Sequence, residues 1–225
     1  MTSVAAENVY RPQEDSLLLI EALAGSDAIR GGQVLDLCTG SGLVAIAAAE
    51  MGAGTVTALD NSATAVDCAT ANVSVAEVDV EVVLGSWSKA LDCGPFDAVV
   101  CNPPYVPTSR DVDPTSIASW SGPADAWSGG EDGRLVLDPL CDTVSSMLAE
   151  GGSLFMVQSE FAGVDESVAR LCRSGLSVVI SATRSIPWGP VVCAQAEWLI
   201  ESGRLSRRRQ LSREERLFVI RAVKS

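Results

Sequence analysis

The heptapeptide CNPPYVP at residues 101–107 combines groups that can hold a substrate with a rigid backbone. It follows the apolar run FDAVV (96–100), and its two prolines fix φ and end any strand there. The side chain of Asn102 offers a carbonyl acceptor, and the main-chain carbonyl of Pro103 offers another. Two such acceptors match both hydrogens of a planar –NH2 group. The motif therefore predicts that Asn102 and Pro103 orient a planar nitrogen, against which Tyr105 packs.

When both hydrogens are held, the lone pair of the nitrogen is free to face an electrophilic carbon. This work is mostly orientation and proximity, and it needs no strong base. The chain contains no histidine, which excludes Ser-His and Cys-His nucleophiles and most metal-hydrolase mechanisms. Its seven cysteines form no C-x-x-C pair, so no metal site is expected.

A second candidate site is the turn DLCTGSG at residues 36–42, which directly follows a predicted strand. Gly40 and Gly42 let the backbone turn tightly and approach a ligand closely. The turn begins with Asp36, whose carboxylate repels a pyrophosphate and suits a ligand with an ammonium or sulfonium group. Asp60, at the end of the next predicted strand, is placed to accept hydrogen bonds from two ribose hydroxyls. These two acids favour S-adenosylmethionine over NAD as the cofactor.

The elements that must position these residues follow from alternating apolar β-branched runs and Ala/Leu-rich segments. Strands are predicted at 33–38, 55–60, 78–85, 96–102, 152–158, 176–183 and 216–223. Helices are predicted at 42–52, 62–73, 135–150 and 163–175, and a further helix begins near Pro12 or Gln13. This alternation predicts an α/β fold with an open, doubly wound, mostly parallel seven-stranded sheet and an antiparallel last strand. The connection between the last two strands shows no convincing helix.

Residues 1–225 are expected to form one domain, in which residues 1–30 are a lead-in and a helix that cover the cofactor site. Residues 103–134 are a predicted loop, long enough to indicate a function or disorder. Within it, DAWSGGEDGR suggests a substrate gate with Trp127 and Arg134 near the mouth. Alternatively, its glycines make a tight approach into the next helix, with Asp132 as the helix cap.

The charge of the chain is unevenly distributed. Residues 1–203 carry 8 Lys/Arg against 27 Asp/Glu, a net charge of −19, whereas the residues from Arg204 onward carry 8 against 2. The acidic residues 1–203 are expected to repel nucleic acid. The basic stretch GRLSRRRQLSREER has two interpretations: it is a solvated loop, or it is a local patch that attracts nucleic acid. No apolar run approaches a membrane span, and the amino terminus lacks the features of a signal peptide. We therefore expect a cytoplasmic protein without membrane partners.

The chain resembles the class I S-adenosylmethionine-dependent methyltransferases, specifically the HemK-like N5-glutamine methyltransferases that modify translation release factors. The resemblance spans most of the chain and rests on VYRPQEDSLLLIEAL, LDLCTGSG, ALDNS, VCNPPYVPT, AWSGGEDGRLVLD, IPWGP and RLFVIRAVK. NPPY alone is shared with adenine-N6 DNA methyltransferases. Since YRPQEDS begins at Tyr10, we expect no separate amino-terminal helical domain, as in the short archaeal and eukaryotic subgroup. That subgroup uses a small zinc-containing activating partner.

The resemblance also implies roles for individual residues. It assigns the substrate amide to Asn102, Pro103 and Tyr105. It assigns cofactor contacts to Ser16, Asp36, Thr39, Gly40, Gly42, Asp60, Asn61, Ser86, Trp87 and Asn102. Among these, Asp60 would hold the ribose and Trp87 would lie against the adenine. Long members of the family carry an acid where this chain has Ser86, and the chain departs from them there.

The leading hypothesis is therefore methylation of a glutamine side-chain amide in a protein, a release factor by the resemblance. Adenine-N6 methylation of DNA or RNA is an alternative with equivalent chemistry, but the base must be flipped out, and the acidic body disfavours a nucleic acid. Lysine methylation is a third reading, and it would need a deprotonated amine and a route for the lost proton. A cofactor-binding scaffold without activity is the reading that NPPY disfavours most.

Overall fold

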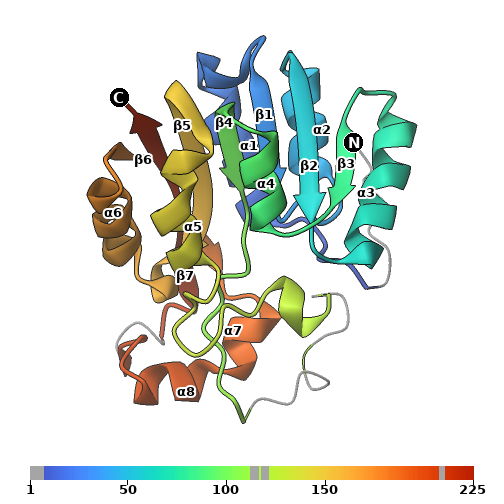
Figure 1. Cartoon of the computed structure of the whole chain (residues 1–225). Helices are drawn as coiled ribbons and strands as arrows, with labels where there is room; N and C mark the ends of the chain where they lie inside the picture. The colour runs from blue at the N-terminus through green and yellow to red at the C-terminus, as the bar shows by residue number, and fades with distance from the viewer. Residues whose placement is uncertain (1–7, 112–116, 118–121, 208–210) are drawn as a thin grey trace.

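The computed structural model describes residues 8–111, 117, 122–207 and 211–225, so parts of the predicted long loop and of the basic stretch lie outside the described residues. The described strands form one seven-stranded sheet of order β3-β2-β1-β4-β5-β7-β6 (Figure 1). The strands are β1 (Gln33–Leu37), β2 (Thr55–Asp60), β3 (Glu81–Leu84), β4 (Phe96–Cys101), β5 (Leu148–Ser159), β6 (Leu176–Pro187) and β7 (Glu214–Lys224). Strands β1 to β5 pair in parallel, whereas β7 is antiparallel to both β5 and β6. The predicted mostly parallel sheet with an antiparallel last strand is confirmed.

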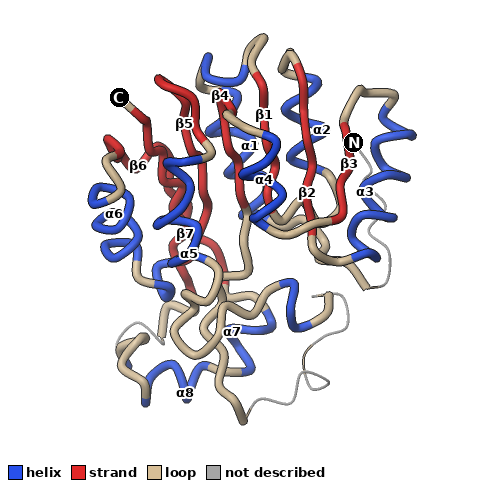
Figure 2. The backbone as a smooth tube through the Cα atoms, in the orientation of Figure 1, coloured by secondary structure: helices blue, strands red, loops and turns tan. Residues whose placement is uncertain are grey.

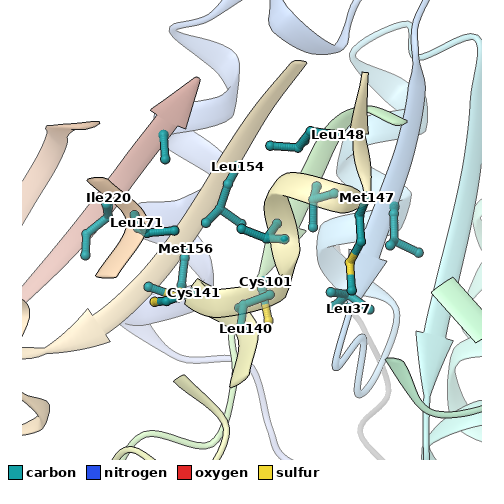
Figure 3. Close-up of a cluster of buried hydrophobic side chains, with 14 of the residues drawn as sticks. Leu37, Cys101, Leu140, Cys141, Met147, Leu148, Leu154, Met156, Leu171 and Ile220 are labelled. Carbon is teal, nitrogen blue, oxygen red and sulfur yellow. The ribbon is translucent and has the colours of Figure 1, made fainter. Parts of the chain in front are cut away.

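Helices lie on both sides of the sheet, as a doubly wound fold requires (Figure 2). They are α1 (Glu14–Ala24), α2 (Leu43–Glu50), α3 (Ala63–Ala76), α4 (Trp87–Cys93), α5 (Leu137–Thr143), α6 (Val164–Arg173), α7 (Pro190–Ala194) and α8 (Ala196–Glu201). Helices α1 and α2 pack in one buried apolar cluster against the sheet, and α4, α5 and α6 contribute to another. Figure 3 shows the latter, where Cys141 of α5 lies beside Met156 of β5 and Leu140 lies beside Cys101 of β4. Within the described ranges, no helix is long and apolar enough to cross a bilayer.

The order of the strands places the two candidate motifs side by side. From β1 the chain moves outward through β2 and β3, and then returns to the other side of β1 as β4. Strands β1 and β4 are in register at their ends, where Leu37 pairs with Cys101. Ligands of open α/β sheets bind outside the carboxyl ends of the strands at such a reversal. The glycine turn after β1 and the NPPY segment after β4 therefore meet at one crevice.

The segment after the NPPY loop differs from its prediction. The predicted helix 135–150 is wrong in length, since α5 ends at Thr143 and is followed by a 3₁₀ turn. Val144, Ser145 and Ser146 are weak helix formers, and Leu148 already pairs with Phe96 of β4. The helix therefore ends early because the residues from Leu148 onward pair with β4 as a strand. Helix α4, in the connection between β3 and β4, was not predicted at all.

The connection between β6 and β7 is also different, because it contains α7 and α8 rather than no helix. Pro190 starts α7 at a position where a missing N–H costs nothing. Helices this short are not stable alone. They form here because Val192 and Leu199 are buried against Phe161 and Trp188. In Figure 1 these two helices lie beyond the lower end of the sheet, together with the chain that follows β4.

Candidate active site

Asn102 follows the end of β4 and lines two neighbouring cavities. Its Nδ2 donates a hydrogen bond to Oγ of Ser16, 3.1 Å away. Its Oδ1 accepts no hydrogen bond from the described residues, so this oxygen is available to a donor from a ligand. Pro103, the second predicted acceptor, lies beside it in the wall of the larger cavity.

The smaller cavity, of about 30 Å³, lies on the side of the glycine turn. Its wall brings together Ser16, Asp36, Thr39, Gly40 and Asn102, five of the residues predicted to contact the cofactor. The cavity lies at the carboxyl ends of β1 and β4, where a ligand is expected. The remaining predicted contacts lie outside it.

Asp36 is buried and braces the glycine turn. Its Oδ2 accepts hydrogen bonds from Oγ1 of Thr39 at 2.6 Å and from the backbone N–H of Ala45 at 3.1 Å. Burial raises the pKa of Asp36 to about 7, against the opposing effect of these two hydrogen bonds. Gly42 caps α2 with φ of 82°, and a Cβ there would lie 3.2 Å from Cβ of Ala69. Gly42 therefore serves the packing of the turn on α3 rather than the wall of the cavity.

Asp60, the last residue of β2, binds the glycine turn that follows β1. One carboxylate oxygen accepts the backbone N–H of Gly40 at 2.9 Å, and the other accepts that of Ser62 at 2.9 Å. A carboxylate accepts about four hydrogen bonds, so the geometry leaves room for two ribose hydroxyls. Asn61 and Ser86 are exposed after the ends of β2 and β3.

Trp87, the first residue of α4, is half-buried against the core cluster of α5 and α6. With Asn61 and Ser86 it flanks the same edge of the sheet as the small cavity, although none of the three lines it. An adenine lying against Trp87 would rest outside the cavity, above the ends of β2 and β3.

The larger cavity, of about 160 Å³, lies on the other side of Asn102. Tyr10, Tyr105 and Trp127 contribute aromatic walls, and Pro103 contributes the rigid corner. The hydroxyls of Tyr10 and Tyr105 both donate to Oδ2 of Asp15, at 2.8 and 3.1 Å. Burial raises the pKa of each tyrosine well above its ordinary value, with a further rise from Asp15. Both phenols are therefore neutral donors, and Asp15 fixes the ring of Tyr105.

Glu215 is a buried acid in this cavity that the sequence did not indicate. It accepts a hydrogen bond from Oγ of Ser159 at 2.6 Å. Burial raises its pKa to about 7, although the bond from Ser159 acts in the other direction. In the sequence Glu215 is hidden between two charged neighbours in the EER run of the basic stretch. Tyr10 and Asp15 were also missed, although the string YRPQEDS contains both.

The loop after NPPY is held on the site by glycines. Gly133 has φ of 75°, and a Cβ there would lie 2.5 Å from the carbonyl oxygen of Tyr105. The tight approach thus faces the NPPY segment itself. The cap of α5 is Val136, so the prediction of Asp132 as the helix cap is wrong; its Oδ1 accepts the N–H of Arg134 instead.

Arg134 lines neither cavity, in contrast to Trp127, which is part of the wall of the larger one. Its guanidinium donates to the carbonyl oxygens of Ala162 and Gly163, at the start of α6, and forms an ion pair with Asp138. The predicted place of Arg134 at the mouth of the site is therefore wrong. Arg134 ties the loop and α5 to α6.

The arrangement can hold a methyl donor in the smaller cavity and a planar nitrogen in the larger one, with the side-chain amide of Asn102 between them. Among the residues that the structure describes, no lysine or arginine lines either cavity, so these walls lack the cations that bind phosphates. A doubly wound sheet with an acid-bearing glycine turn after β1 and NPPY after the neighbouring β4 is the arrangement expected from the resemblance to class I methyltransferases.

Comparisons with known proteins agree with this class. The model of the methyltransferase small domain matches residues 9–117. A protein of Methanocaldococcus jannaschii that carries the name "putative protein N5-glutamine methyltransferase" is 32% identical, over 84% of this chain and 91% of its own length. The chain belongs to this family of protein N5-glutamine methyltransferases. The release factor glutamine methyltransferase of Deinococcus radiodurans is 36% identical over 69% of this chain.

Solved structures with the same fold include the Mtq2–Trm112 complex of E. cuniculi, responsible for methylation of the eRF1 termination factor. The match covers 98% of this chain and 100% of that chain, with 24% identity and a TM-score of 0.63. A T. thermophilus 16S rRNA methyltransferase in complex with AdoMet and guanosine matches with a TM-score of 0.58, 20% identity, and coverage of 96% of this chain and 44% of that chain. The methyl donor of the family is S-adenosylmethionine. The chain spans only 54 to 57% of the length of three bacterial release factor glutamine methyltransferases, that of Deinococcus radiodurans among them.

Proposed function

We propose that this protein methylates the side-chain amide nitrogen of a glutamine in a translation release factor. The supporting observation is the place of Asn102, which lines both cavities and has its amide oxygen available. Relatives that cover most of this chain are named for glutamine methylation, and several of these names include release factors.

On the cofactor side, we assign the ribose to Asp60, the adenine to the face of Trp87, and the methionine part to the turn around Asp36 and Gly40. When bound, S-adenosylmethionine supplies a methyl carbon made electrophilic by the sulfonium. The backbone at Gly40 is held by Asp60, so the turn is already formed to receive the ligand. Pre-formed sites lose less free energy to ordering on binding.

On the substrate side, Oδ1 of Asn102 and the carbonyl oxygen of Pro103 accept the two amide hydrogens of the glutamine. Holding both aims the nitrogen at the smaller cavity, and proximity contributes most of the rate. The ring of Tyr105, fixed by Asp15, packs against the amide plane, while Trp127 excludes water from the same pocket.

Further expectations accompany this proposal. Residues 10 to 16 contribute to the walls of both cavities, which supports a single domain whose lead-in covers the site. The related fold of Mtq2 was solved with Trm112, so we include a small activating partner in the proposal. Because the proposed substrate acts in translation, the proposal also includes a cytoplasmic location.

The test is mass spectrometry of a release factor, and of glutamine peptides derived from it, after incubation with this protein and labelled S-adenosylmethionine. We expect one added methyl group that maps to a glutamine side chain. A label on lysine, or none with and without a partner protein, contradicts the proposal. A filter-binding assay with oligonucleotides at two salt concentrations serves as the control, because a nucleic acid enzyme would show a steep loss of affinity with salt.

A further inference from the structure

The first turn of α1 contacts the NPPY segment through two buried polar side chains. Asp15 and Ser16 are each only 4% exposed, although they lie next to one another at the start of a helix. Asp15 binds the hydroxyl of Tyr105, and Ser16 binds the amide of Asn102. Two residues of α1 therefore contact two of the residues assigned to the substrate.

The hydrogen bonds between these groups have a fixed direction. Oδ1 of Asp15 accepts the backbone N–H of Ser16 at 2.6 Å and its hydroxyl at 3.3 Å. A carboxylate only accepts, and a serine hydroxyl has a single hydrogen to donate. Once that hydrogen points at Asp15, the oxygen of Ser16 can only accept, and it does so from Nδ2 of Asn102 at 3.1 Å.

This direction decides which end of the Asn102 amide faces the reaction. With Nδ2 held by Ser16, Oδ1 is the end presented to the substrate. If the amide turned over, Asn102 would present an –NH2 group to the –NH2 group of its substrate, and two donors cannot form a hydrogen bond. The turned amide would also face the lone pairs of Ser16 with its own oxygen.

We infer that Ser16 is a positioning residue for methyl transfer: its hydroxyl, oriented by Asp15, keeps the amide of Asn102 in the one orientation that accepts a substrate N–H. This inference rests on the proposed function of Asn102. It differs from the role expected from the sequence, in which Ser16 contacts the cofactor. Both roles are compatible with a place in the wall of the smaller cavity, so the two must be separated by what a variant changes.

The experiment compares Ser16→Ala, Ser16→Thr and Ser16→Val in single-turnover methyl transfer to a glutamine peptide at saturating S-adenosylmethionine. Threonine keeps the hydroxyl and valine has the same shape without it, so this pair controls for packing at a buried position. Loss of the hydrogen bond that orients Asn102 lowers the single-turnover rate constant about 10- to 100-fold. We expect this loss for the alanine and valine variants, most of the activity for threonine, and an unchanged cofactor Kd by calorimetry for all three.

Asn102→Ala provides the reference that separates this inference from the proposed function. If Ser16 acts through Asn102, adding Ser16→Ala to Asn102→Ala causes no further loss. An impaired Asn102→Ala beside an active Ser16→Ala overturns the inference and leaves the proposed function in place. A weaker cofactor Kd with an unchanged single-turnover rate constant in both Ser16→Ala and Ser16→Val also overturns it. If Asn102→Ala is as active as the natural protein, the proposed role of Asn102 itself is wrong. Should the alanine variant fail to fold, the threonine and valine pair gives the same decision.

Discussion

Replacing Arg134 with methionine is expected to destabilise the fold and to leave the affinity for a glutamine peptide unchanged. The side chain of Arg134 is 9% exposed, and methionine fills similar space without any donor. The carbonyl oxygens of Ala162 and Gly163 would lose their bonds to this side chain. The carbonyl oxygen of Gly163 keeps the backbone N–H of Ser167 at 3.3 Å. The main cost therefore comes from the buried carbonyl oxygen of Ala162, since a buried acceptor without a partner costs about 1–3 kcal/mol. The loss to Asp138 is smaller, because that carboxylate is 28% exposed and keeps a 2.9 Å ion pair with Arg170.

One unpartnered buried acceptor together with the smaller losses gives an expected loss of about 2–4 kcal/mol in the free energy of unfolding. Urea unfolding followed by tryptophan fluorescence measures it. Arg134→Lys is the matched control, because it keeps the charge but not the planar guanidinium. We expect its free energy of unfolding to lie between those of the natural protein and the methionine variant. A methionine variant within about 1 kcal/mol of the natural protein, but with a raised KM for the peptide, would refute this reasoning and restore Arg134 to the mouth of the site.

Three further changes test the site. The folded pKa of Glu215, about 7, lies above the ordinary 4.5, so the folded state binds more protons between these values and stability falls as pH rises through that window. Glu215→Gln lacks this titrating group. Between pH 5 and pH 8 the free energy of unfolding of the variant should therefore rise relative to that of the natural protein by on the order of 3 kcal/mol. A difference between the two proteins that does not change with pH contradicts the burial argument. Asp60→Ala should weaken cofactor affinity at least about tenfold by calorimetry, and normal binding would remove the ribose assignment. Gly133→Ala places a Cβ 2.5 Å from the carbonyl oxygen of Tyr105, so peptide methylation should fall while cofactor affinity is kept, and full activity would show that the NPPY segment is not held by this contact.

The fold was largely predictable because its signals are local. Apolar β-branched runs separated by helices place the strands, and the turn at Gly40 and Gly42 identifies the cofactor end of the sheet. The short helices α7 and α8 were not predictable in this way. They depend on burial of Val192 and Leu199 against residues distant in the sequence, and no periodicity of five or six residues can reveal that.

The candidate site was predictable where a motif concentrates it and not where tertiary contacts assemble it. Asn102 and Pro103 stand together in NPPY, but the partner of Asn102 lies 86 residues earlier, at Ser16. Glu215 enters the larger cavity only because β7 lies beside β5, where Ser159 donates to it. An acid in a charged run carries no sign of burial in the sequence, so its place could be found only from the structure.

The most direct test of the central claim is a crystal structure with S-adenosylhomocysteine and a glutamine peptide bound. We predict that the glutamine side-chain nitrogen lies within hydrogen-bond distance of both Oδ1 of Asn102 and the carbonyl oxygen of Pro103, with Nδ2 of Asn102 still on Ser16. A glutamine nitrogen bound elsewhere, or an Asn102 amide whose oxygen faces Ser16, would contradict the account.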